Sequence, residues 1–347
     1  MDVKTIDTIF QLGKFALLTP KSRSEKTPSL GRKIYAFILM VFLTVGALVN
    51  IVCKIPHYQT LGLMQMVLRV LSDFSLLLST VFALVMVKTT TRGWYHLIRN
   101  LSQVCGSGTS RKTAFVAWFV SETLILICMQ VAFMRKAAFR FIQTHFFQIL
   151  QIFFIFFRAV TGITVLHMVK QCYHSQKEII RKGFEALPSV EHNLLLLKEA
   201  VSCFNDIFGW NFFYFIIFGI CRTLVLIDDN VKSPKGMITR VVYYNFSLEV
   251  LGGLVILVKF WTYALYFIML ADKVVKEFDD IFADFSEIFA RTTNNKKYSL
   301  LNEIEQCRPK FSAARFYDIN KSTVFSIIST VTTFVIIILQ FELRVEF

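Results

Sequence analysis

A row of hydroxyl and amide side chains near the end of this chain carries its most informative chemistry. Each residue of an α-helix turns by about 100°, and at that spacing five polar residues fall within one arc of about 60°, on which only Ile336 is apolar. This polar stripe consists of Ser322, Ser326, Ser329, Thr333 and Gln340. The residues between them are apolar enough to cross a membrane, where an amide is costly unless it meets another helix or water. The polar stripe therefore predicts the wall of a hydrated path through a membrane.

A second interpretation of the same stripe is helix packing. Small polar residues let membrane helices approach closely, and their hydroxyls can bond back to the backbone. Gln340 favours the hydrated path, because an amide needs more partners than a packing face offers. We hypothesise that Gln340 and Phe341 form the outer gate and that Thr333 and Ser329 line the path. Ile336 and Ile337 then form an apolar band that could gate by dewetting.

The whole composition is that of an all-α membrane protein. The chain is 55% hydrophobic and contains 37 phenylalanines, and too little polar surface remains to cover a soluble core of that size. A helix needs about 20 apolar residues to span a bilayer. Seven runs meet this length, and they predict seven transmembrane helices, at residues 34–52, 66–87, 114–134, 145–169, 208–227, 241–270 and 323–341.

The net charge of +14 could indicate nucleic-acid binding, but the positions of the basic residues indicate a membrane orientation instead. If the N-terminus is inside, the cytoplasmic segments hold 25 Lys and Arg and the exterior segments hold 8. Basic residues favour the cytoplasmic side of a membrane protein. We therefore predict that the N-terminus is inside, that the C-terminus is outside, and that membrane lipid rather than nucleic acid surrounds the chain.

Two apolar periodicities predict cytoplasmic helical extensions of the spans. One leads from Leu194 into the fifth span and the other continues from Val274 to Ile288 after the sixth, each at a spacing of three to four residues. We expect these extensions to pack together rather than to lie on lipid, because the second carries an acidic polar face that an anionic leaflet would repel. The predicted organisation is a cytoplasmic tail (1–33), a six-span ligand-binding bundle (34–270), a cytoplasmic helical anchor region (271–322), a pore-lining last span (323–341) and an exterior tail (342–347).

Charged and aromatic residues within the predicted spans are candidates for a ligand site. Ionisable groups at membrane depth are expensive and usually functional, although pairing between neighbouring helices, such as Arg222 with Glu249 or Asp73, also explains them. Glu122, Arg158 and Lys259 belong to the same class. Aromatic residues near the exterior ends fit either an interfacial belt or the wall of an outward pocket. The candidate ligand-binding residues are Asp73, Phe146, Phe147, Arg222, Tyr243, Tyr244 and Glu249.

No motif of an enzyme is present in the sequence. The chain has no Gly-rich phosphate loop, no His-Glu-x-x-His and no nucleophile elbow. Its seven cysteines show no paired spacing, so that we expect neither a disulfide framework nor a zinc site. The sequence therefore predicts no catalytic residue, no metal and no cofactor.

The end of the last predicted span resembles a family signature. Thr333-Phe334, five apolar residues and Gln340-Phe341 are similar to the Thr-Tyr, five apolar residues, Gln-Phe signature of insect gustatory receptors, with Phe in place of Tyr. The resemblance implies a tastant-gated, non-selective cation channel in the plasma membrane of sensory neurons. It also implies a homotetramer, or a heterotetramer with other gustatory receptor subunits, around a pore made by the last span. Each subunit would bind a small-molecule tastant in a pocket that opens outward.

One position bears on the kind of tastant. Sugar-sensing members of the family generally carry Glu directly after the Thr-Tyr pair, whereas this chain has Val335 there. The resemblance therefore implies a non-sugar, bitter-type compound.

The alternative is a seven-span G-protein-coupled receptor for a small molecule. It explains seven helices and an outward pocket, but the charge distribution places the N-terminus inside, and no Asp-Arg-Tyr or Asn-Pro-x-x-Tyr tract is present. A secondary transporter would carry inverted repeats with matching broken helices, and only Gly252-Gly253 suggests a break.

Overall fold

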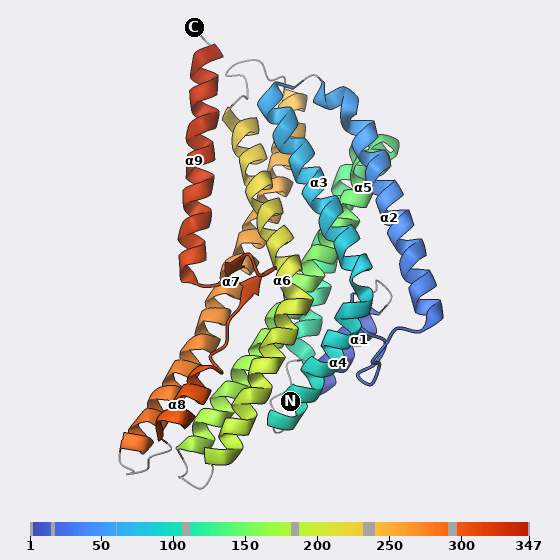
Figure 1. Cartoon of the computed structure of the whole chain (residues 1–347). Helices are drawn as coiled ribbons and strands as arrows, with labels where there is room; N and C mark the ends of the chain where they lie inside the picture. The colour runs from blue at the N-terminus through green and yellow to red at the C-terminus, as the bar shows by residue number, and fades with distance from the viewer. Residues whose placement is uncertain are drawn as a thin grey trace.

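The computed structural model describes residues 3–14, 18–59, 61–105, 112–181, 187–231, 240–290 and 297–345; some side chains within these ranges, including those of 129–145, 240–251 and 341–345, are not described. The described chain is almost entirely helical, as predicted (Figure 1). Its elements are α1 (Val3–Gly13), α2 (Leu30–Tyr58), α3 (Leu63–Val85), α4 (Val87–Val104), α5 (Lys112–Ile180), α6 (Leu187–Val231), α7 (Arg240–Ala290), α8 (Lys297–Glu305), β1 (Ser312–Ala313), β2 (Tyr317–Asp318) and α9 (Lys321–Val345).

Six of the seven predicted spans correspond to helices of suitable length and hydropathy among the described residues. The candidate spans are Leu30–Pro56, Leu63–Phe82, Phe146–Ile180, Pro188–Asp228, Gly252–Ala290 and Lys321–Ile338. The predicted third span, 114–134, is not among them. It lies in the first part of α5, a single element that continues through the predicted fourth span.

The chain reverses direction within α5. Phe119 lies 5.9 Å from Phe153 and 5.8 Å from Phe157 between ring centroids, and Phe115 lies 6.5 Å from Phe157. In a straight helix, Phe119 and Phe157 would be separated by about 57 Å. The first and second arms of α5 therefore lie side by side and antiparallel, and Figure 1 shows the bend near one end of the bundle.

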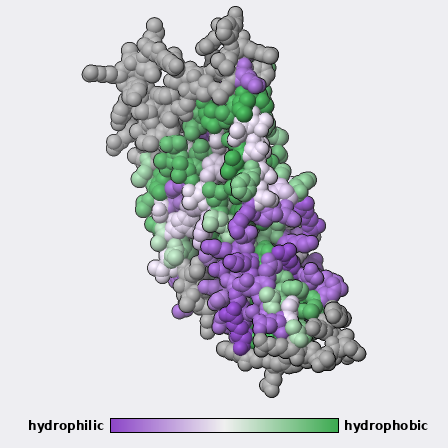
Figure 2. Space-filling model, turned by 90° about the vertical axis from the view of Figure 1, so that its left-hand side faces the viewer, coloured by the Kyte–Doolittle hydropathy of each residue, from purple (hydrophilic) through white to green (hydrophobic). Residues whose placement is uncertain are grey.

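Apolar and polar surface separate along the length of the molecule. On the face drawn in Figure 2, apolar residues gather over the upper part and hydrophilic residues over the lower part. α2 exposes a long apolar side, which includes Phe37 at 62% and Val52 at 61%. An exposed apolar surface of this length suits lipid and would be costly in water.

The predicted helical extensions are present as the lower parts of α6 and α7. Leu194, Leu197, Val274 and Phe278 are at most 1% exposed and belong to the main apolar core. The acidic side of α7 lies along the basic end of α5, where Lys177 Nζ is 2.5 Å from Asp280 Oδ2. One turn further along both helices, Arg181 Nε is 3.2 Å from Asp284 Oδ2. The acidic face predicted on α7 is thus matched by cations of the same chain.

Two features of the lower part differ from the sequence analysis. The segment predicted as a tail contains α1, whose Ile6, Ile9 and Phe10 are at most 2% exposed. Sequence spacing predicted no disulfide, but Cys105, after α4, is bonded to Cys172 of α5. The two cysteines are 67 residues apart in sequence, so that only the tertiary fold brings them together.

Candidate functional site

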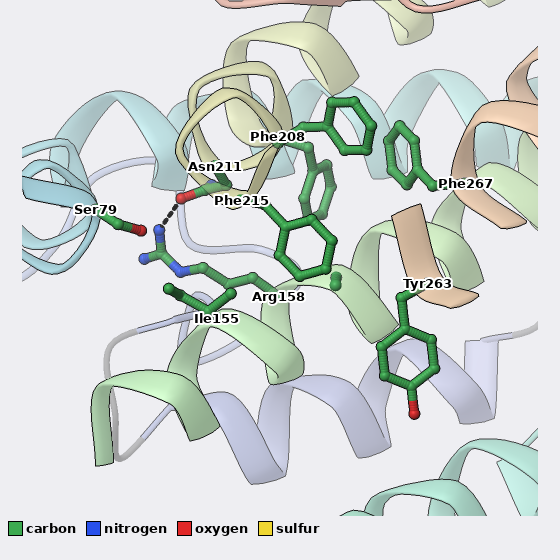
Figure 3. A pocket seen from close by; sticks show the side chains of 10 residues that line it. Ser79, Ile155, Arg158, Phe208, Asn211, Phe215, Tyr263 and Phe267 are labelled. Atoms are coloured by element: carbon green, nitrogen blue, oxygen red, sulfur yellow. Dashed lines mark hydrogen bonds between the residues drawn. The ribbon is translucent and has the colours of Figure 1, made fainter. Parts of the chain in front are cut away.

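A small pocket lies where α3, α5, α6 and α7 meet (Figure 3). Its volume is about 20 Å³, and on this measure one water molecule needs roughly 10–15 Å³. Any larger ligand must therefore displace side chains. The pocket is lined by Ser79 of α3, Ile155, Arg158 and Ala159 of α5, Phe208, Asn211, Phe212 and Phe215 of α6, and Tyr263 and Phe267 of α7.

One end of the pocket is charged. Arg158 Nη1 donates a hydrogen bond to Asn211 Oδ1, and the hydroxyl of Ser79 points toward the same guanidinium (Figure 3). Asn211 Nδ2 donates to the backbone oxygen of Ile207 at 2.8 Å. Because this bond uses the amide nitrogen, it turns the amide oxygen toward Arg158. The half-buried Arg158 guanidinium is therefore fixed in orientation beside apolar rings.

The opposite wall of the pocket is aromatic. The rings of Phe212 and Phe267 are stacked with their centroids 4.5 Å apart, and Phe208 lies 4.8 Å from Phe204 behind it. Offset-stacked rings of this kind favour planar apolar partners. The pocket thus combines one polar, cationic end with an apolar wall, as ligand sites commonly do.

Two of the predicted intramembrane charges pair with each other beside the pocket. Lys259 Nζ donates to both oxygens of Glu122 at 3.0 Å. The hydroxyl of Tyr263, whose ring lines the pocket, donates to Glu122 Oε1 and accepts a hydrogen bond from Trp118 Nε1 at 2.5 Å. This arrangement matches the interpretation of such charges as pairs between neighbouring helices.

The predicted ligand residue Asp73 belongs to a separate polar cluster near the junction of α2 and α3. Asp73 Oδ2 accepts hydrogen bonds from Lys54 Nζ at 2.9 Å and from the Tyr58 hydroxyl at 2.5 Å. Lys54 Nζ also donates to Gln148 Oε1 at 3.1 Å. The sequence analysis offered Asp73 and Glu249 as alternative partners of Arg222; the structure adds Lys54, from the segment between the first two predicted spans, as a cation bonded to Asp73.

The remaining predicted ligand residues do not line the pocket. The ring of Phe147 packs on the backbone at Gly46, where a Cβ would lie 2.0 Å from it, and Phe146 is 40% exposed beside it. Arg222 lies on α6, outside the pocket lining. The side chains of Tyr243, Tyr244 and Glu249 lie outside the part of the chain that the structure describes. Sequence reasoning noted Arg158 only as a charge within a span, and it missed Ser79, Asn211 and the aromatic wall.

The polar stripe lies on the open side of α9. Ser322, Ser326, Ser329, Thr333 and Gln340 are all exposed, as is Ile336 at 50%, and Ile337 is half-buried. The buried positions Thr323, Ile327 and Ile338 lie on the opposite side, toward the bundle. Thr333 Oγ1 donates to the Ser329 backbone oxygen at 2.9 Å, so its hydroxyl bonds back to the helix, as the packing interpretation allowed. The Phe341 side chain is not described.

The short hairpin of β1 and β2, which lies between α8 and α9 in the chain, packs on the pocket helix α6. Asn205 of α6 holds the strand before the turn with both atoms of its amide: Nδ2 donates to the Lys310 backbone oxygen at 2.7 Å, and Oδ1 accepts from the Ser312 backbone nitrogen at 3.2 Å. The hairpin also lies directly on Gly209, where a Cβ would be 2.8 Å from the Ser312 oxygen. These contacts lie within two turns of the pocket residues Phe208 and Asn211.

The other strand of the hairpin leads directly into α9. The Tyr317 hydroxyl is buried, which raises its pKa to about 12 and keeps it neutral. Asn320 Oδ1 then accepts from the Thr323 backbone nitrogen at 3.2 Å and caps the first turn of α9. The start of α9 is therefore fixed to the same turns of α6 that line the pocket.

Comparison with known families decides what kind of protein has this arrangement. Residues 15–344 match the family described as 7tm chemosensory receptor. The chain belongs to this family of insect chemosensory receptors. The family resemblance read from the last span is thereby confirmed at the level of chemosensory receptors, and the family is one of membrane receptors rather than enzymes. The G-protein-coupled receptor alternative is not favoured.

The chemosensory receptor shares its fold with a solved structure. It is similar to the insect olfactory receptor OR5 from Machilis hrabei, with a TM-score of 0.67, 11% identity, and coverage of 97% of this chain and 98% of that one. A structure of OR5 in complex with eugenol matches with a TM-score of 0.57 and 10% identity, over 97% and 99% of the two chains. No curated protein sequence matches the chain. At these identities the likeness to OR5 shows the fold alone.

Proposed function

We propose that this chemosensory receptor is a gustatory receptor, a subunit of a tastant-gated, non-selective cation channel. In this proposal the first arm of α5 is the third of seven spans, and the tastant binds in the pocket between α3, α5, α6 and α7. The polar stripe of α9 lines the pore, with Gln340 and Phe341 as its outer gate.

The observation that carries the proposal is the position of the polar stripe. Its residues are exposed on the side of α9 away from the bundle, where no helix of the described part of the chain covers them. Four copies of α9 around one axis would turn these hydroxyls and amides toward a common water-filled path. The chain would therefore act as a homotetramer, or as a heterotetramer with other gustatory receptor subunits, in the plasma membrane of sensory neurons.

The pocket supports gating by a small molecule. OR5 has been solved in complex with eugenol, and we propose that this receptor also takes a small organic ligand within its bundle. A volume of about 20 Å³ means that a ligand must move lining side chains, four of which belong to α6, and α6 is bonded to the hairpin that leads to α9. Val335, in place of the Glu of sugar-sensing members, supports a bitter-type compound.

Whole-cell recording from cells that express the full chain tests this proposal. We expect bitter compounds, but not sugars, to open a current that carries Na⁺ and K⁺ alike and that persists when G proteins are blocked. Coexpression with a second gustatory receptor subunit separates the homomeric from the heteromeric form. Surface-expressed receptor that passes no ligand-evoked current in either setting, or a response that disappears with G-protein block, would contradict the proposal.

A further inference from the structure

The charge of the pocket is positive. The residues that line it include one cation, Arg158, and no carboxylate. Glu122, which accepts from the Tyr263 hydroxyl behind the pocket wall, is already bonded to Lys259. Asn211, the residue bonded to Arg158 in the pocket, is a neutral amide. A ligand that complements this end of the pocket therefore brings a hydrogen-bond acceptor, and a negative charge suits it best.

The rest of the pocket determines the other part of the ligand. Phe208, Phe212, Phe215 and Phe267 leave an apolar, ring-lined space beside the guanidinium (Figure 3). Flat aromatic ligands pack against such walls with little loss of conformational freedom. Because the space is small, one ring with a short acidic side chain fits better than a larger molecule.

A row of buried polar groups leads from the pocket toward the Lys54–Asp73 cluster. Seven residues, or about two helical turns, separate Ser72 from Ser79 in α3 and Gln151 from Arg158 in α5. Ser72 Oγ and Gln151 Nε2 are buried and have no hydrogen-bond partner among the described residues. Buried polar groups of this kind are normally satisfied by protein or water. Ser72 and Gln151 are therefore buried polar groups on the same faces of α3 and α5 that carry Ser79 and Arg158.

We infer that the pocket selects small aromatic carboxylates, with Arg158 binding the carboxylate and the phenylalanine wall holding the ring. This inference rests on the proposed function and adds the chemical class of its ligand. Asn211 acts as a positioning residue, because it accepts a hydrogen bond from the guanidinium at the pocket end, and the Ser79 hydroxyl points toward the same group.

The test compares 3-phenylpropionate with its methyl ester and with 3-phenylpropanol, which have the same ring but no charge. Binding to the purified full-length receptor is measured as the ligand-dependent rise in unfolding temperature, and gating is measured as the concentration for half-maximal current. We expect the acid to act at a concentration at least about tenfold lower than the ester, because a charge-assisted hydrogen bond in a desolvated site is stronger than a neutral one.

Two variants assign the preference to Arg158. Arg158→Met removes the charge at similar volume and should abolish the preference for the acid, whereas Arg158→Lys should keep part of it. Asn211→Asp is a milder change, which places a carboxylate beside Arg158 and should also abolish the preference without removing the guanidinium. Lys170→Met, which removes a cation near Glu277 of α7 outside the pocket, serves as the control and should leave the preference unchanged.

The outcomes separate this inference from the proposed function. Stabilisation by the acid without any current supports the ligand class and contradicts the channel. Current with equal potency of acid and ester contradicts the ligand class and leaves the channel standing. The inference is also overturned if no acid stabilises the receptor, or if the preference persists in both Arg158→Met and Asn211→Asp.

Discussion

At the scale of single residues, the buried pair Glu122–Lys259 links charge burial to stability. The Glu122 side chain is 8% exposed and that of Lys259 is 21% exposed, so neither charge can rely on solvent. We predict that Lys259→Met destabilises the receptor by about 3–5 kcal/mol, because it leaves a buried carboxylate without its cation. The measurements are the unfolding temperature in detergent and the amount of receptor at the cell surface.

The matched control for this prediction is the double variant Glu122→Met/Lys259→Met. Replacing both charges by apolar groups of similar volume removes the unpaired carboxylate and should restore most of the lost stability. If Lys259→Met alone is as stable as the unchanged receptor, the pair contributes nothing to the fold.

The polar stripe gives a second prediction at this scale. Gln340 is exposed on the open side of α9, and in the proposed pore its amide meets permeating ions. We predict that Gln340→Ala changes single-channel conductance and the relative permeability to cations, while surface expression is unchanged. Thr332→Ala, an exposed position outside the stripe, should change neither. Identical conductance, permeability and gating in Gln340→Ala would remove Gln340 from the gate.

At the scale of elements, the hairpin between α8 and α9 lies between the pocket helix α6 and the proposed pore helix α9. Asn205→Ala removes two hydrogen bonds to the hairpin backbone, each contributing about 1 kcal/mol. We predict a shift of roughly five- to thirtyfold in the ligand concentration for half-maximal current, without a change in the ligand-dependent rise of the unfolding temperature. A change in gating without a change in ligand binding is expected only if the hairpin transmits ligand binding in the pocket to α9.

Ser202→Ala is the control for the hairpin, since Ser202 is exposed on α6 three residues before Asn205. It should leave both measurements unchanged. A parallel loss of binding and gating in Asn205→Ala would mean that Asn205 only stabilises the fold.

The elements also show what the sequence could and could not reveal. Long apolar runs predicted the helices well, because hydropathy measures directly what a membrane requires. The turn within α5 was expected between the predicted spans 114–134 and 145–169, although the chain has no Gly or Pro between Lys112 and Thr161 to mark it. The hairpin was missed because Ala314 and Arg315 adopt positive φ, a conformation that sequence rules associate with Gly or Asn.

The pocket illustrates a different limit. Sequence reasoning recognised Arg158 as a charge within a span, but its partner Asn211 is 53 residues away in sequence. Which faces of α3, α5, α6 and α7 meet depends on the register between helices, and a single amphipathic pattern does not encode it. The residues expected at the pocket were chosen by depth and aromatic content, and these properties do not report which residues face one another.

At the scale of the whole molecule, the exposed surface of α9 and the separation of polar and apolar surface determine how the receptor sits in a membrane. Only 11% of the residues in the α9 span are buried within the chain, so most of this helix must contact lipid, water or other subunits. The apolar upper part and the hydrophilic lower part in Figure 2 fit a bundle whose lower end extends beyond the bilayer. The ladder of ion pairs between α5 and α7 lies in that lower part, where partly exposed pairs of this kind add little stability.

The orientation of that lower part gives the last prediction. The segments assigned to the cytoplasm carry 25 Lys and Arg against 8 on the other side, and the N-terminal and C-terminal ends lie toward opposite ends of the bundle (Figure 1). An N-terminal epitope tag should therefore stain only after permeabilisation, whereas a C-terminal tag should stain intact cells. Both tags on one chain, detected with different antibodies, control for expression and cell integrity. Staining of the N-terminal tag on intact cells would contradict the orientation predicted from the basic residues. It would place the lower helices outside the cell, in the orientation that a G-protein-coupled receptor requires.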